Sequence, residues 1–440
     1  MLKNLLLSLS LLILLQISVK AQIVKTPNKI HPYSIHLSED GSRYIKFGIN
    51  AQLWGRYSNL NPGSKVGSNT TQNNFDVVIR RLRIQAMGML TEKVYFHIQL
   101  GQNNINFTQN SGPSNAPFSI LDVLGEYHFN KKFQVGGGLC GYGAGTTRYS
   151  AQSSTTQLTL DAPIYQQNNV SSTFGNRNLS VYAKGMIGKF NYRAVVTNPY
   201  KQNTSSINTT SSISTLTPKP QVLGMLTYHF LDKESIEQPY NRGTYLGTKK
   251  VFNIAAGFMY GANAMWHISE NVAKDTIKQD MTVFGLDVFY DAPLSDKGNA
   301  LTLYAAYNYC NYGKNYTRMI ATPNPASVGS GTGFIGIGTG NIFYAQAGYL
   351  FNKKVTEDGK DKGRTQVFVA SEVAVLDGLK SPMSMFEAGF NYYITGTFGP
   401  KISLSYQNRS VYEATLQAGE TKLNSSARKG MLVLQYQISF

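Results

Sequence analysis

The feature that most constrains this chain is an alternation of apolar and polar residues that recurs in segments of about ten residues. In the segment 45–53, every odd-numbered residue is apolar and the even-numbered residues are polar or glycine. The segment 432–440 keeps the same period, with its apolar residues at even numbers. A period of two is typical of strands that have one apolar face. Strands of this length, when tilted, span a bilayer, whereas strands of soluble sandwiches are usually about five or six residues long.

Composition narrows the choice of fold class further. The 440 residues include only 15% charged residues, and 41 Lys plus Arg against 24 Asp plus Glu give a formal net charge of +17. The mean hydropathy of −0.22 excludes a bundle of membrane helices. It does not exclude a β-barrel, because alternation dilutes the apolar residues of a barrel strand. Soluble all-β proteins and membrane β-barrels therefore remain.

The N-terminus predicts export of the protein. Lys3 precedes an apolar stretch over 5–19, and Val19-Lys20-Ala21 has the small-residue spacing of a signal-peptidase site. We expect a signal peptide over 1–21, a periplasmic tail over 22–42 and a barrel over 43–440. The alternative is an uncleaved anchor, for which the apolar stretch is short.

Sixteen segments fit strands, an even number as bacterial barrels require. They are 43–57, 75–90, 92–107, 119–130, 132–143, 177–187, 189–199, 219–231, 248–262, 280–291, 299–311, 341–352, 363–373, 384–395, 399–411 and 427–440.

The connections between these segments alternate in length. Every second gap is short, such as Thr91, Lys131 and Gly188, and the gaps between them are long, such as 144–176 and 312–340. Short periplasmic turns and long extracellular loops are typical of outer-membrane barrels. The sequence therefore predicts an all-β, transmembrane antiparallel β-barrel of about 16 strands in the cell outer membrane. One gap on the short side, 232–247, is longer than this pattern expects.

Motifs of enzymes and cofactor sites are missing from the sequence. It has no nucleophile elbow, P-loop or dinucleotide fingerprint, and its six His lack zinc-site spacing. We therefore expect no enzyme activity, no cofactor and no metal. Cys140 and Cys310 lie on distant strands, which favours two unpaired thiols, although two Cys in an exported chain can also form a disulfide.

If apolar positions face lipid, residues of the opposite parity face the lumen. The inward cations are Lys46, Arg56, Arg81, Arg83, Lys184, Arg193, Arg364 and Arg409. The inward acids are Asp122, Glu126, Asp287, Glu372 and Glu387. The excess of cations predicts a lumen that favours anions. The alternative is that these residues pair across the wall, with Asp122 or Glu126 as counter-charge for Arg81 and Arg83.

Several segments in order along the chain resemble one family of outer-membrane channels. The segments are Arg80-Arg81-Leu82-Arg83 with Gly88, the strand segments 120–129 and 133–139, Arg177 to Gly185, and 388–393. They resemble the phosphate-selective porin O and P family, although Asn178 and Ser180 depart from its pattern. The C-terminal Phe440 resembles the assembly signal of bacterial outer-membrane proteins.

The resemblance implies a porin, commonly a homotrimer, that lets small hydrophilic or anionic solutes diffuse passively. Outer-membrane lipid and lipopolysaccharide would surround it, and no nucleic acid is expected as a partner. It also implies a third outer loop that folds inward and narrows the pore, by position 144–176. This loop contains Arg148 and Asp161 but no Lys, so we expect a general anion preference without phosphate selectivity. The alternative function is a barrel component of a secretion or adhesion assembly that acts through its outer loops.

Overall fold

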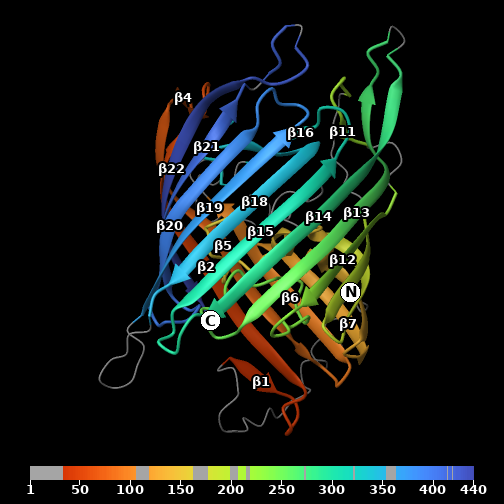
Figure 1. Ribbon diagram of the computed structural model, residues 1–440, viewed down its shortest axis with the longest axis vertical. Helices are drawn as coiled ribbons and strands as arrows, with labels where there is room; N and C mark the ends of the chain where they lie inside the picture. The colour runs from red at the N-terminus through yellow and green to blue at the C-terminus, as the bar shows by residue number, and fades with distance from the viewer. Residues whose placement is uncertain are drawn as a thin grey trace, which may run out of the picture.

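Long antiparallel strands close into a barrel in the computed structural model (Figure 1). The residues that it describes are 33–105, 118–161, 177–198, 207–214, 219–271, 274–320, 323–352, 363–413, 415–418 and 420–440. The predicted signal peptide lies outside these residues, as does most of the predicted tail. Among the described residues, no helix is long and apolar enough to cross a bilayer.

The main sheet holds eighteen of the described strands, two of which are short additions: β1 (Ser34–His36) and β11 (Ser212–Ile213). The other sixteen form the wall, at the places where the alternation predicts them. They are β2 (Tyr44–Asn59), β5 (Asn73–Met89), β6 (Val94–Ile105), β7 (Ser119–Asn130), β8 (Phe133–Cys140), β9 (Asn178–Ile187), β10 (Phe190–Thr197), β12 (Gln221–His229), β13 (Val251–Ile268), β14 (Thr276–Pro293), β15 (Ala300–Asn311), β18 (Gly340–Leu350), β19 (Arg364–Leu376), β20 (Met383–Tyr393), β21 (Lys401–Tyr412) and β22 (Ser425–Ser439).

The first and last wall strands close the barrel. β2 pairs on one side with β5 and on the other with β22, with Leu53 opposite Tyr436. Every strand edge of the wall is therefore paired, which removes the edges that an open sheet would expose in a membrane. Phe440 belongs to this closure, because its amide donates to the carbonyl oxygen of Ile49 at 3.1 Å.

The two faces of the wall differ as the alternation predicts. On β22, Leu434 and Tyr436 are 53% and 42% exposed on the outer surface, while Gln435 and Gln437 are 1% and 0% exposed inside the barrel. An apolar exterior and a polar interior are the arrangement that a bilayer requires of a barrel. Cys140 and Cys310 are both buried thiols that form no disulfide with each other, as expected.

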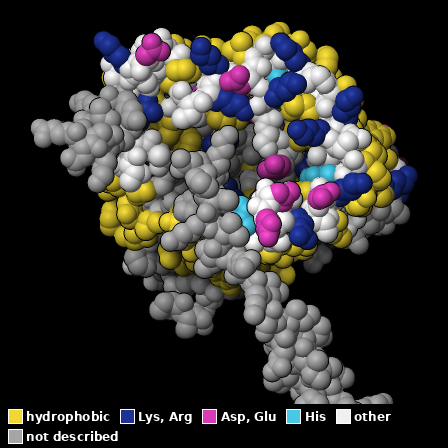
Figure 2. Space-filling model, turned by 90° about the horizontal axis from the view of Figure 1, so that it is seen from below, with side chains coloured by type: hydrophobic (Ala, Val, Ile, Leu, Met, Phe, Trp, Pro, Cys, Tyr) yellow, Lys and Arg dark blue, Asp and Glu magenta, His cyan; other side chains and the backbone are white. Residues whose placement is uncertain are grey.

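The two ends of the barrel differ in the length of their connections. In Figure 1 the longer loops lie at the upper end, and the short turns lie at the lower end beside β1. Viewed from this lower end, Lys and Arg side chains lie along part of the rim, and a group of acidic side chains lies nearer its middle (Figure 2). The predicted tail contains a strand that its sequence does not indicate: Ser34–His36 pairs with β2.

A β-bulge in β5 interrupts the predicted alternation of inward and outward side chains at Arg80. Gln52 pairs with Arg81 and Leu53 pairs with Ile79, so Arg80 has no opposite residue on β2. A bulge adds one residue to one strand and shifts the alternation beyond it. Arg80 and Arg81 are consequently both buried in the lumen, at 3% and 2% exposed. The prediction counted Arg81 alone as inward and missed Arg80.

Candidate functional site

The segment 141–161, which follows β8 at the long-loop end, lies inside the barrel. It contains two short 3-10 helices, η2 (Gly141–Ala144) and η3 (Arg148–Ala151). Tyr149 and Leu158 are both 0% exposed. The described part of the predicted constriction loop therefore folds inward, as the family resemblance implies; its remainder, 162–176, lies outside the described residues.

The first part of this segment is seated on β13, β14 and β15. Gly257 and Gly285 face each other on β13 and β14, and a Cβ on Gly285 would lie 2.7 Å from the carbonyl oxygen of Thr146. Asn308 of β15 donates to the Thr146 hydroxyl at 3.1 Å. The backbone amide of Arg148 donates to the Asp287 carboxylate. Two glycines thus provide the space, and polar side chains provide the attachment.

The second part of the segment crosses a row of polar side chains at one level of the wall. The backbone register places Lys401, Gln437, Gln52 and Arg81 side by side on β21, β22, β2 and β5. Gln52 donates to Gln437 at 2.8 Å, and Arg81 donates to Gln52 at 2.7 Å.

The inserted segment bonds to this row through its backbone. The carbonyl oxygens of Ser154 and Gln157 accept hydrogen bonds from Gln52 at 3.0 Å and from Lys401 at 3.2 Å. We name the side chains of Lys401, Gln437, Gln52 and Arg81, together with those of Arg80 and Asp161, the constriction row.

Asp161 compensates part of the positive charge of this row. Its carboxylate bonds to Arg80 at 2.8 Å and also to Arg81. Burial raises the pKa of Asp161, but the two guanidinium groups outweigh that effect and hold the pKa below its usual range. Two arginines against one aspartate leave a formal charge of +1. Among the described residues, no acidic side chain forms a salt bridge with Lys401.

A second segment, 230–250, enters the lumen from the short-turn end between β12 and β13. Arg148 binds Glu234 through two contacts of 2.6 Å each. Burial raises the pKa of Glu234, but the Arg148 guanidinium and the Tyr245 hydroxyl outweigh this effect and hold the pKa at about 2. Glu234 is therefore ionised at neutral pH. This segment contains the gap that was longer than the pattern of short turns expects.

Other predicted luminal charges also form ion pairs. Arg56 binds Asp76 at 2.6 Å, and Lys184 binds Glu126 at 2.6 Å. Asp122 binds Arg177 at 2.9 Å, a residue that the parity argument did not include. The suggestion that Asp122 or Glu126 compensates Arg81 and Arg83 is therefore wrong for Arg81, whose partner is Asp161.

The remaining predicted residues also lie on the inner side of the wall. Arg83 bonds to the side chain of Asn103. Arg409, Arg364 and Arg193 donate to the carbonyl oxygens of Asn59, Leu246 and Gly145, respectively. Lys46 is half-buried on β2. Glu387 accepts a hydrogen bond from the Leu160 amide, and Glu372 has no hydrogen-bond partner among the described residues. The structure thus brings Arg81, Arg148 and several acids to the inserted segments. Their role in selectivity stays a prediction.

Sequence reasoning missed Arg80, Arg177 and Glu234. A signal for Arg80 was present, because two adjacent arginines within one membrane strand cannot alternate without one of them facing lipid, and that is costly. The unusual length of 232–247 was the signal for Glu234. Arg177 is the first residue of the predicted strand 177–187 and has the odd-numbered parity of the lipid-facing Leu179 and Val181, whereas the observed strand begins only at Asn178.

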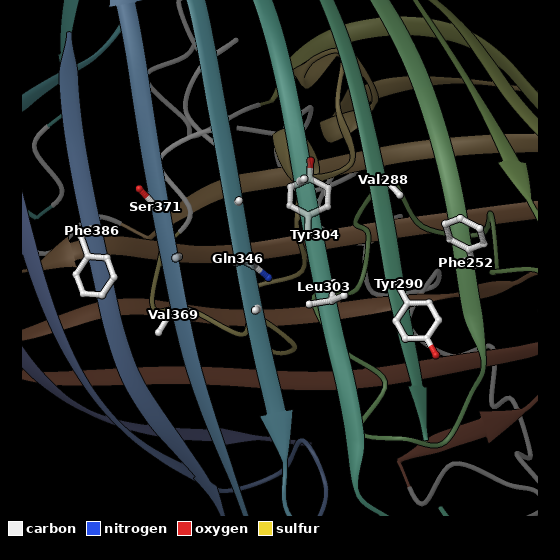
Figure 3. Close-up of a pocket in the computed structure, with 13 residues that line it drawn as sticks. Phe252, Val288, Tyr290, Leu303, Tyr304, Gln346, Val369, Ser371 and Phe386 are labelled. Atoms are coloured by element: carbon white, nitrogen blue, oxygen red, sulfur yellow. The ribbon is translucent and has the colours of Figure 1, made fainter. Parts of the chain in front are cut away.

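A further hollow of about 680 Å³ lies on the outer face of the wall, across β13 to β20 (Figure 3). Exposed side chains such as Leu303, Val369 and Phe386 surround it, and Ala305 and Ala345 lie within it. Its apolar lining suits contact with lipid.

Comparisons with known proteins support the fold. No protein-family model matches the chain, and no curated protein sequence matches it. Among solved structures, Pseudomonas putida OprB at high pH aligns with a TM-score of 0.52 at 10% identity, covering 90% of this chain and 94% of that chain. The channel DcaP of Acinetobacter baumannii gives 0.49 at 14% identity, covering 94% and 99%. The anion-selective porin from Comamonas acidovorans gives 0.46 at 9% identity, covering 90% and 99%.

At these sequence identities the similarity concerns the fold alone, and it is the OprB alignment, with its TM-score of 0.52, that supports the fold. The chain is a β-barrel of the outer-membrane type, with the architecture of porins.

Proposed function

We propose that this protein is an outer-membrane porin through which small hydrophilic solutes diffuse passively, with a preference for anions. The observation that carries the proposal is the constriction row, where an inserted segment narrows a polar lumen and leaves positive charge in excess. Fixed cations at a narrow zone lower the barrier to anions by replacing part of their hydration. The resemblance to phosphate-selective porins is compatible with this class, although the predicted constriction loop 144–176 has no Lys.

The proposal extends to the state of the protein in the cell. The mature chain begins at Gln22 after removal of the signal peptide, and it assembles as a homotrimer surrounded by outer-membrane lipid and lipopolysaccharide. The cation excess at the constriction row favours anions in general, because the predicted constriction loop 144–176 supplies no Lys that would form a dense cationic cluster for phosphate.

Single-channel recording of the refolded protein tests this function. We expect ohmic current and, in a salt gradient, a reversal potential that indicates anion preference, most clearly at low salt where screening is weak. Current carried mainly by cations would contradict the preference. Block of chloride current by micromolar phosphate would contradict general anion passage and favour phosphate selectivity.

One observation favours a second candidate, a barrel component of an envelope assembly that acts through its outer loops. Several described lumen-facing side chains are almost fully covered: Gln52 is 1% exposed, and Arg56, Arg409 and Gln437 are 0% exposed. A lumen packed so closely suits a structural barrel better than a wide channel. Absence of current from correctly refolded protein would favour this candidate.

A further inference from the structure

Two segments that enter the barrel from opposite ends join inside it. The segment 141–161 comes from the long-loop end and 230–250 from the short-turn end. Gln152 and Asn241 form a parallel β-bridge. The amide of Ser153 donates to the carbonyl oxygen of Asn241 at 2.8 Å, and the amide of Asn241 donates to that of Ala151 at 2.8 Å. The two backbones are thus paired within the lumen.

Buried side chains reinforce this pairing. Arg148 donates to both carboxylate oxygens of Glu234 at 2.6 Å and to the carbonyl oxygen of Arg242 at 2.8 Å. The side chains of Arg148 and Glu234 are 4% and 10% exposed. The Glu234 carboxylate also accepts hydrogen bonds from Tyr245 and Asn253. A bidentate pair of this kind fixes orientation as well as separation. We name the contact between Arg148 and Glu234, together with the Gln152–Asn241 bridge, the lumen junction.

Each segment is attached to a different part of the wall. In 230–250, Tyr240 donates to Asp122 of β7, and the carbonyl oxygen of Ile236 accepts a hydrogen bond from Lys184 of β9 at 2.7 Å. The segment 141–161 is attached to β14 and β15 by Asp287 and Asn308, and to β21 by Lys401. The lumen junction therefore connects the β7–β9 wall to the β14–β21 wall across the interior.

We infer that the lumen junction sets the aperture of the channel and that Arg148 and Glu234 are its positioning residues. This inference rests on the proposed function. It assigns Arg148 a role different from the selectivity residue that the sequence suggests, because Glu234 balances its charge. If one partner is neutralised, the other remains as an uncompensated buried charge, which favours separation of the segments and entry of water.

The experiment compares single-channel conductance and reversal potential for wild type, Arg148→Gln, Glu234→Gln and the double variant. We expect the conductance to rise about two-fold in all three variants, because each one opens the same contact. The reversal potential should move toward cation preference in Arg148→Gln, toward anion preference in Glu234→Gln, and stay unchanged in the double variant. The matched control is Lys380→Gln with Glu420→Gln, which removes an exposed ion pair in the outer loops and should change neither quantity.

A crosslink keeps the test decisive if the charge variants refold poorly. Gln152→Cys with Asn241→Cys, in a background where Cys140 and Cys310 are Ala, should conduct more than wild type when reduced, because Asn241 no longer donates to the Arg148 carbonyl oxygen. Oxidation should return the conductance to the wild-type level, because the disulfide holds the segments together. Conductance that responds neither to the charge variants nor to oxidation would overturn the aperture role. A shift in reversal potential without a rise in conductance would overturn it as well and leave Arg148 as a selectivity residue. No current from any of the proteins would overturn the proposed function itself, whereas a conducting wild type with unaltered variants would overturn the lumen junction alone.

Discussion

The wall strands bond to one another through continuous backbone ladders, whereas the segments 141–161 and 230–250 bond to the wall largely through side chains. Each of the sixteen wall strands has two antiparallel neighbours. The inserted segments depend on single contacts such as the Arg148 amide with Asp287 and Lys401 with the Gln157 carbonyl. This difference separates two roles: the wall supplies most of the folding stability, and the inserted segments determine which solutes pass through the lumen. A substitution in the wall should therefore change the free energy of unfolding, and one at the inserted segments should change the current.

The largest effect on stability is expected within the wall at Arg56 and Asp76. These side chains pair across β2 and β5 and are 0% and 2% exposed. Asp76→Asn leaves the Arg56 charge buried without its partner, which should lower the free energy of unfolding by about 3–5 kcal/mol. Urea titration of the barrel in detergent micelles measures the change. Glu270→Gln, at an exposed ion pair, is the control and should leave the midpoint unaltered; equal losses in both variants would remove the distinction between wall and surface.

A slightly smaller effect is expected on the lipid face of the same wall. Leu434 is 53% exposed on β22, where Leu434→Arg places a charge in the hydrocarbon and should cost about 2–4 kcal/mol. Ser426→Arg lies on the same strand near its outer end and should cost much less, because the penalty falls toward the interface. Folding titrations into lipid vesicles compare the two variants. Similar costs at both positions would show that Leu434 does not face the membrane core.

A substitution where the inserted segment 141–161 packs against β13 should change both the folding stability and the single-channel current. A side chain at Gly257 would overlap the backbone of Thr146. Gly257→Ala should therefore cost about 1–3 kcal/mol by overpacking, and it should also change the single-channel conductance because the segment must move. Gly55→Ala is the control, since a Cβ there meets nothing within 4 Å. If Gly257→Ala behaves like Gly55→Ala in both measurements, the segment is not seated on β13.

The same contrast explains what the sequence could predict. Alternation is local, so sixteen strands and the inward position of residues such as Arg83 follow from the chain itself. The bulge at Arg80 interrupts the period by one residue, and its one signal in the sequence is the pair of adjacent arginines, Arg80 and Arg81. Whether a loop folds inward depends on partners distant in sequence, as Arg148 with Asp287 shows. The pairing of Arg81 with Asp161 was beyond sequence reasoning for the same reason.

The last effect concerns the current and is expected from the charges of the constriction row. Arg80, Arg81 and Asp161 have a formal charge of +1 together. Asp161→Asn raises it to +2, Arg80→Gln with Arg81→Gln lowers it to −1, and the triple variant leaves it at zero. If these charges act on permeating ions, reversal potentials should rank from most anion-preferring to least in the order Asp161→Asn, wild type, triple variant and double variant.

Recordings at two salt concentrations separate this electrostatic effect from a change of shape. The spread among the four proteins should be wide at 0.1 M salt, where the screening length is about 10 Å, and narrow at 1 M, where it is about 3 Å. A change of shape would persist at high salt. A ranking that ignores the net charge, or that is the same at both concentrations, would mean that Arg80 and Arg81 hold the inserted segment in place and that the ion preference arises elsewhere in the lumen.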